Sequence, residues 1–110
     1  MRLPNGERAI IDIRKLRDYC LNAAHPRGQH KARVFRSQLG LGQEHADWLR
    51  ERLREVAKTE DAQAGAMDAF GQRFVIDFEV AGPLGTAVVR SCWIVRAGEA
   101  VPRLTSCFVL

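Results

Sequence analysis

The chain has 110 residues, of which 46% are apolar and 27% are charged, and its formal net charge is +4. This composition predicts one globular domain spanning residues 1–110 and excludes a disordered chain. The apolar runs are too short for a transmembrane helix or for the core of a signal peptide. We therefore expect a cytoplasmic protein that does not contact a membrane.

The positive charge is concentrated in the first part of the chain. Residues 1–40 contain nine Lys or Arg and three Asp or Glu, a surplus of +6, so the remaining residues carry −2. Such a distribution suggests an acidic partner, either nucleic acid or an acidic protein. The alternative is that the excess of Arg over Lys simply reflects genome composition.

The three cysteines are an odd set without the spacing of a metal site. Each lies on an apolar segment, which predicts buried free thiols at Cys20, Cys92 and Cys107. We expect no metal, no other cofactor and no disulfide framework.

Three helices are predicted in the first half of the chain, after a short strand at residues 8–11. Asp12 is a good N-cap for a helix over residues 13–21. A loop with His25-Pro26 and Gly28 leads to a second helix over residues 29–39, with Ala32, Phe35 and Leu39 on its buried face. The third helix spans residues 43–58 and carries charge pairs at i, i+3 on its exposed face.

The second half of the chain is predicted to be β. Small and polar residues 59–71 are typical of a mobile connection. Alternation over residues 72–81, a Gly82-Pro83-Leu84-Gly85 hairpin and a strand over residues 86–96 follow. After a turn, residues 103–110 form a last strand. The predicted fold is α+β, with three N-terminal helices packed on a C-terminal antiparallel sheet of three to four strands.

The most unusual stretch of the chain is residues 21–35. It holds two of the three histidines and three Lys or Arg around a proline and a glycine, at a loop that leads into a helix. The start of a helix suits an anion such as phosphate. Histidine can act as acid or base in metal-independent RNA cleavage, and Lys and Arg can neutralise phosphate. The alternative is that His25 caps or packs in its loop and that His30 is a surface residue.

The polar face of the sheet provides a second group of candidates. Arg90, Arg103 and Thr105 could project towards a ligand, with Arg73 as a further candidate. For Asp77 and Glu79 we favour ordinary solvent-exposed positions, because two carboxylates would repel phosphate. His45 is interpreted as a residue at the edge of the core. No Gly-rich phosphate loop, HExxH, nucleophile elbow or paired CxxC is present.

Three blocks of the sequence together resemble a family of short bacterial proteins known as a domain of unknown function. The most distinctive block is LN-x-x-HP-x-G-x-HKA-x-x-F, from Leu21 to Phe35. The others are the strand that begins Gly71-Gln72-Arg73-Phe74 and the closing stretch from Arg103 to Leu110. The resemblance covers the whole chain.

That family is similar to the superfamily of barnase, EndoU, colicin-type and RelE-type ribonucleases, which includes bacterial toxin domains. The similarity lies in the HKA-like helix start and in the order of helices followed by a sheet. This resemblance implies a catalytic or phosphate-binding role for His30 and Lys31, and it matches Arg90 and Thr105 to polar residues of the sheet. EndoU-type enzymes use a second catalytic histidine, for which only His25 is available. The resemblance also implies an antitoxin or immunity protein as partner.

Two hypotheses follow. In the first, the protein is a metal-independent ribonuclease of the toxin type, with a site made of His30, Lys31, His25, Arg90 and Thr105. RNA would then be bound by Arg27, Lys31, Arg33 and Arg103. In the second, it is a non-catalytic binding module, immunity-like, antitoxin-like or an adaptor, that docks a partner through its basic face. The two differ in space, because an enzyme needs these residues in one cleft. The oligomeric state is not predicted.

Overall fold

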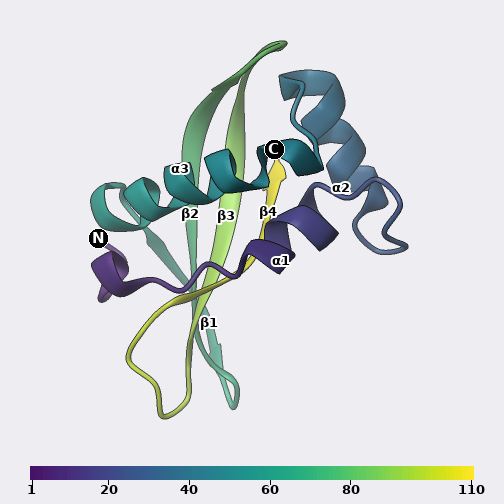
Figure 1. Ribbon diagram of the computed structural model, residues 1–110. Helices are drawn as coiled ribbons and strands as arrows, with labels where there is room; N and C mark the ends of the chain where they lie inside the picture. Colours follow the sequence, from purple (N-terminus) through teal and green to yellow (C-terminus); the bar gives the residue numbers. More distant parts are fainter.

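The computed structural model describes residues 1–110 and contains three helical segments followed by a four-stranded antiparallel sheet (Figure 1). The strands follow one another in the order β1-β2-β3-β4, so every connection joins neighbouring strands. The predicted α+β class and the order of its elements are confirmed.

The first helical segment is α1 (Ile13–Lys15), continued by the π-helical turn η2 (Leu16–Cys20), after an isolated 3₁₀ turn, η1 (Gly6–Arg8). Asp12 caps it as predicted, because its side chain accepts a hydrogen bond from the backbone N–H of Arg14 at 3.0 Å.

The second and third segments also lie where the periodicity placed them. α2 (Gln29–Val34) continues into the π-helical turn η3 (Phe35–Leu39), which ends at Gly40 with a φ of 73°. The 3₁₀ turn η4 (Gln43–His45) leads into α3 (Ala46–Thr59), whose exposed face carries three i, i+3 ion pairs. His45 accepts a hydrogen bond from the backbone N–H of Gly42 through Nδ1 at 3.0 Å.

The three predicted strands are β2 (Gly71–Gly82), β3 (Gly85–Arg96) and β4 (Arg103–Val109). Gly82 pairs with Gly85 across the predicted hairpin. Alternate residues of β2 are buried from Phe74 to Val80, which confirms the predicted alternation.

Two predictions at the element level were wrong. Residues 8–11 do not form a strand. Only Ile10 pairs with β4, through a single parallel bridge to Arg103, while Ile11 enters the core. Conversely, the predicted mobile connection contains the edge strand β1 (Gln63–Asp68). All of β1 is exposed, so it needs no apolar alternation and is held by pairing with β2.

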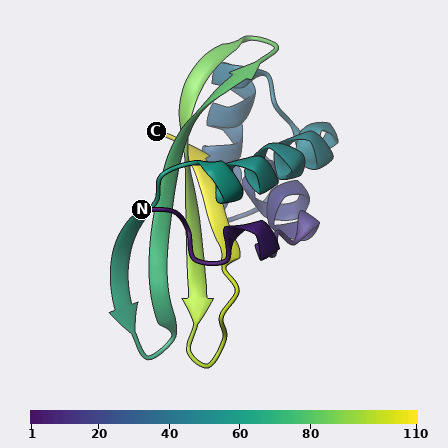
Figure 2. The ribbon, with the colours of Figure 1, turned by 90° about the vertical axis from the view of Figure 1, so that its left-hand side faces the viewer.

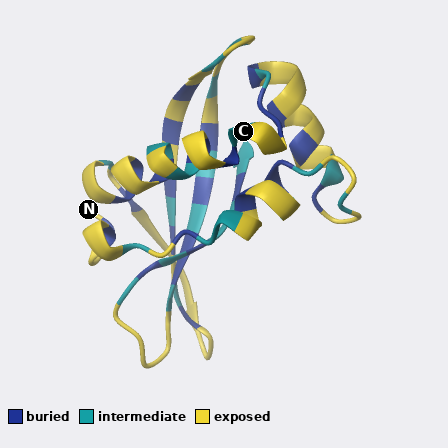
Figure 3. Ribbon diagram, in the orientation of Figure 1, coloured by how far each residue is buried: buried dark blue, intermediate teal, exposed yellow.

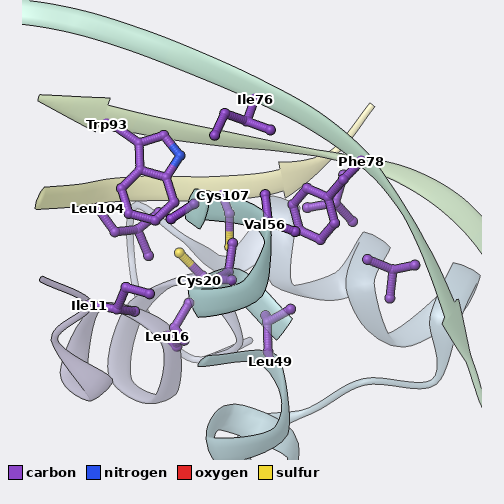
Figure 4. Close-up of a cluster of buried hydrophobic side chains, with 14 of the residues drawn as sticks. Ile11, Leu16, Cys20, Leu49, Val56, Ile76, Phe78, Trp93, Leu104 and Cys107 are labelled. Carbon is purple, nitrogen blue, oxygen red and sulfur yellow. The ribbon is translucent and has the colours of Figure 1, made fainter. Parts of the chain in front are cut away.

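The helices cover one face of the sheet, and the other face is open (Figure 2). Buried side chains concentrate where these two layers meet, whereas the hairpin tips and the outer helix surfaces are exposed (Figure 3). Trp93, Ile76 and Leu104 of the sheet meet Leu16 and Leu49 of the helices in this core (Figure 4). No helix has both the length and the apolar character needed to cross a membrane.

The three cysteines form no disulfide. Cys20 and Cys107 lie in the core between η2 and β4, as predicted, whereas Cys92 on β3 is only partly buried.

Candidate functional site

The largest depression on the surface lies at the β4 edge of the sheet, beside α1, η2 and the loop before α2. It has a volume of about 640 Å³ and is open to solvent. All but one of its lining residues are polar or charged. They are Asp12, Arg14, Lys15, Asp18, Tyr19, His25, Arg27, Thr105 and Ser106.

The side chain of His25 is held in place by backbone groups of the loop. Its Nδ1 accepts hydrogen bonds from the N–H groups of Arg27 and Gly28, at 3.0 and 3.1 Å. A ring nitrogen that accepts two N–H groups carries no proton, so the neutral imidazole has its proton on Nε2. The ring can therefore offer a ligand a hydrogen-bond donor, and protonation of Nδ1 would break both bonds.

The loop is closely packed on η2. The rings of Tyr19 and His25 meet edge to face, with 4.9 Å between their centroids. A side chain at Gly28 would bring its Cβ to 2.5 Å from the backbone oxygen of Tyr19, so this position requires glycine. Gly28 thus lets the loop pack on η2, and the contacting rings of Tyr19 and His25 both line the depression.

The cations of the depression fall into two groups. Arg14 forms a two-bond pair with Asp12, with N–O distances of 2.8 and 3.1 Å, and this hydrogen bonding lowers the pKa of Asp12 to about 2. Asp18 is paired in the same way with Arg17, which lowers the pKa of Asp18. Lys15 and Arg27 have no carboxylate within 4.0 Å, so their charges are available to an anionic ligand.

β4 contributes the opposite wall through an irregularity in its pairing. The register with β3 shifts between Cys92 and Trp93, which leaves Thr105 as an extra residue on β4. Thr105 donates its hydroxyl to the backbone oxygen of Cys92 at 3.1 Å. The hydroxyl of Ser106 is buried next to it without a hydrogen-bond partner.

The structure brings three of the predicted site residues, His25, Arg27 and Thr105, into this depression. The other predicted site residues do not line it. His30 and Arg33 are exposed on α2, where Arg33 contacts Gln29 at 3.2 Å. Lys31 lies over the ring of Phe108, with its ammonium 4.4 Å from the centroid.

Two predicted residues of the sheet also lie outside the depression. Arg90 projects from the open face of the sheet and makes two hydrogen bonds to Asp77, at 2.8 and 2.9 Å, which lower the pKa of Asp77. Arg103 bonds to Glu99 at 3.2 Å. The sequence therefore predicted a broader set of residues than the depression gathers.

Sequence reasoning had given no site role to Lys15 and Tyr19, which line the depression. The signal that could have identified them is their spacing. Lys15 and Tyr19 stand at i, i+4, so they occupy one face of the first helical segment.

These observations define an α+β protein in which helices cover one face of an antiparallel sheet and a polar depression lies at the sheet edge. The sequence matches the family model described as "Domain of unknown function (DUF6883)" over residues 2–110, and the chain therefore belongs to that family. This match confirms the predicted membership of a family of unknown function. No curated protein matches the chain.

A similar solved structure supports the fold. A chain of the "Contact-dependent growth inhibition toxin - immunity protein complex from Klebsiella pneumoniae 342" superposes with a TM-score of 0.65 at 14% sequence identity. The match covers 92% of this chain and 99% of that chain. The arrangement of helices and sheet described above therefore recurs in a component of a toxin–immunity complex.

Proposed function

We propose that this protein is a ribonuclease of the toxin type that binds the scissile phosphate of RNA in the depression beside β4. One observation carries the proposal. The fold gathers His25, Arg27 and Thr105, three of the residues predicted from sequence, around one open polar depression that also contains Lys15 and Tyr19. The similarity to a chain of a toxin–immunity complex supports a role on one side of such a pair.

Cleavage of RNA without a metal proceeds by attack of the 2′-oxygen on phosphorus, with loss of the 2′-hydroxyl proton to a base, and departure of the 5′-oxygen, which takes up a proton and leaves as a hydroxyl group. Negative charge grows on the phosphate oxygens in the transition state. In our proposal Arg27 and Lys15 neutralise this charge, because neither side chain is paired with a carboxylate of the protein. His25 contributes a hydrogen bond from Nε2–H to a phosphate oxygen, a role that its fixed tautomer suits.

The proton of the 2′-hydroxyl needs a separate acceptor. His25 cannot fill this role in the tautomer that its hydrogen bonds imply, because Nε2 then carries the proton and Nδ1 is bonded to the backbone. Tyr19 lines the depression and belongs to the residue types that transfer protons in enzymes. His30, which the sequence analysis predicted for proton transfer, could do so if the RNA strand extends over α2.

The second candidate function is a non-catalytic binding module. It is favoured by the hydrogen bonding of the histidines, since both His25 and His45 accept backbone N–H groups through Nδ1, as structural residues do. In that case the free cations would serve to dock a partner and the protein would not harm RNA.

We also propose a cognate inhibitor protein as partner. A toxin that acts on cellular RNA must be held inactive in the cell that makes it, and the similar solved chain belongs to a complex of a toxin with an immunity protein. An inhibitor that covers the depression would block access of RNA to Lys15, His25 and Arg27.

The proposal is tested by induced expression in a bacterial host, followed by inspection of growth and of total RNA. The key variant is His25→Asn, because the amide oxygen of asparagine can accept the same backbone N–H groups while the imidazole is removed. His45→Asn is the matched control, since His45 makes the same kind of bond and does not line the depression. His30→Ala tests the predicted acid–base role.

We expect wild type and His45→Asn to arrest growth and fragment RNA, and His25→Asn to lose most of this activity. If the His30→Ala protein is folded but also inactive, His30 is assigned the proton transfer. If it is active, Tyr19 is the better candidate for that role. Normal growth and intact RNA with wild type would contradict the proposal and favour the binding module.

A further inference from the structure

The positive charges of this protein are not equally available to a partner. Nine of the 17 Lys and Arg side chains lie within 4.0 Å of a carboxylate. Of the eight that do not, five lie between Lys15 and Arg36. Residues 19–43 contain no Asp or Glu at all. Unneutralised positive charge is therefore concentrated around the depression and on α2.

Three residues extend the depression onto the surface of α2, and we call them the α2 basic face: Arg27, His30 and Arg33. Arg27 lines the depression, and His30 and Arg33 are exposed one helical turn apart on α2. Gln29 accepts a hydrogen bond from the guanidinium of Arg33 at 3.2 Å and orients it. Arg36 turns away, towards Gly42 and Glu44, and is not part of this face.

The α2 basic face leads away from the depression. α2 and η3 run from the His25 loop to the β2–β3 hairpin, where Leu84 donates its N–H to the backbone oxygen of Leu39 at 3.2 Å (Figure 1). Residues 30–37 of this helix extend about 10 Å along its axis. A ligand that passes from Arg27 to Arg33 therefore follows the exposed side of α2.

The chemistry of this face suits a phosphate backbone better than a protein. A specific protein interface needs a desolvated apolar centre with aromatic anchors. Here the only large apolar side chain of α2 that is exposed is Val34, at 38%. Isolated cations without carboxylate partners, in contrast, are what binding to a polynucleotide backbone requires.

We propose that an RNA strand bound in the depression continues along the α2 basic face, so that the substrate is a single strand longer than a dinucleotide. This inference rests on the proposed function, because it takes the depression as the place of the scissile phosphate. Arg27 then contacts the phosphate at the cleavage point and Arg33 contacts a phosphate further along the strand. Arg33 acts in binding only.

The experiment measures the affinity of the wild-type protein for 2′-O-methylated single-stranded RNA, which cannot be cleaved because the attacking hydroxyl is blocked. A dinucleotide and a decanucleotide are compared at several salt concentrations. The test variant is Arg33→Gln. The control variant is Arg54→Gln, which removes an exposed helical arginine that is paired with Glu51 at 3.3 Å on α3.

We expect the decanucleotide to bind wild type more tightly than the dinucleotide. Arg33→Gln should weaken decanucleotide binding about tenfold at low salt and reduce the slope of log K against log salt by about 0.7, as loss of one phosphate contact on a single strand predicts. Dinucleotide binding should be unchanged, and Arg54→Gln should behave as wild type.

Equal effects of Arg33→Gln on both RNAs, or no effect on either, would overturn the path along α2. Binding of polyglutamate as tight as that of the decanucleotide, with the same dependence on Arg33, would assign the face to an acidic protein and also overturn it. Cleavage of the unmodified decanucleotide is assayed in parallel. If the decanucleotide is not cleaved, but its binding still depends on RNA length and on Arg33, the ribonuclease proposal is refuted and the proposed path of the strand along α2 is supported.

Discussion

The open face of the sheet and the depression at its β4 edge both contain paired arginines, but only the depression also holds cations without a carboxylate partner. On the open face Arg90 is bonded twice to Asp77, and Arg73 lies 3.9 Å from Asp68. At the depression Lys15 and Arg27 have no carboxylate partner. The comparison teaches that a count of cations does not distinguish the two regions, whereas the absence of neutralising partners does.

We expect the largest difference between the two regions when one arginine is removed from each and RNA cleavage is measured. Arg27→Gln should lower kcat/KM for RNA cleavage about 100-fold, because it removes a charged donor from the transition state. Arg90→Gln should leave kcat/KM within about twofold of wild type. Steady-state kinetics on a labelled RNA oligonucleotide checks both variants. Equal losses would abolish the distinction between the two regions.

The next prediction compares the two sides of β3. Ser91 follows Arg90 but faces the helices and is fully buried, where it donates to the oxygen of Ile76 and accepts from Trp93 Nε1, both at 2.9 Å. Ser91→Ala leaves the indole N–H without a partner and should cost about 2 kcal/mol of unfolding free energy. Urea denaturation measures this, with the exposed Ser37→Ala as control. A cost below that of the control would contradict the role given to this hydrogen bond.

Removal of one carboxylate from the depression should leave Arg14 without an ion-pair partner. Asp12→Asn retains a good N-cap for α1 but removes the carboxylate that pairs with Arg14. RNA binding at low salt should become about threefold tighter, since the released pair is solvent-exposed and of modest strength. Titration with the 2′-O-methylated decanucleotide measures the change. Weaker binding would mean that Asp12 itself supports the ligand.

The smallest effect concerns the pair on the open face and its dependence on pH. Arg90 lowers the pKa of Asp77, so the pair stabilises the folded state above the ordinary carboxyl pKa of 3.8, and this contribution is lost as pH falls through the lowered value. Arg90→Gln should lower the free energy of unfolding only slightly at pH 7, because the pair is partly exposed, and by less at pH 3.

Urea denaturation of Arg90→Gln and wild type at both pH values tests this prediction. Glu79→Gln, which changes a carboxylate of the same face that has no ion-pair partner, is the control. A difference between wild type and Arg90→Gln that grows towards pH 3 would contradict the sign.

The sequence predicted the elements that carry a periodic apolar pattern. α3 and β2 repeat their buried residues at the helical and strand periods, and Gly82 and Gly85 mark the hairpin. β1 escaped prediction because an exposed edge strand is held by backbone pairing, which leaves no apolar alternation. Residues 8–11 had β-branched composition, but only Ile10 reaches a partner strand.

The site was predictable only in part for a related reason. The loop that holds His25 and Arg27 is visible in the sequence, because Pro26 and Gly28 interrupt the helices around it. Which strand residues meet this loop depends on how η2 packs against the edge of β4. Thr105 reaches the depression through a local shift in strand register, and Arg90 lies on the far face. Ion pairing, which decides whether a cation is free, is set by the same packing.

The central claim is tested most directly with purified protein and unmodified single-stranded RNA, in the presence of a metal chelator, by identifying the ends of the products. Our account predicts cleavage by wild type with 2′,3′-cyclic phosphate ends, and a loss of about 100-fold in rate for His25→Asn at unchanged stability. No cleavage by folded wild-type protein, or cleavage by His25→Asn at the wild-type rate, would contradict it.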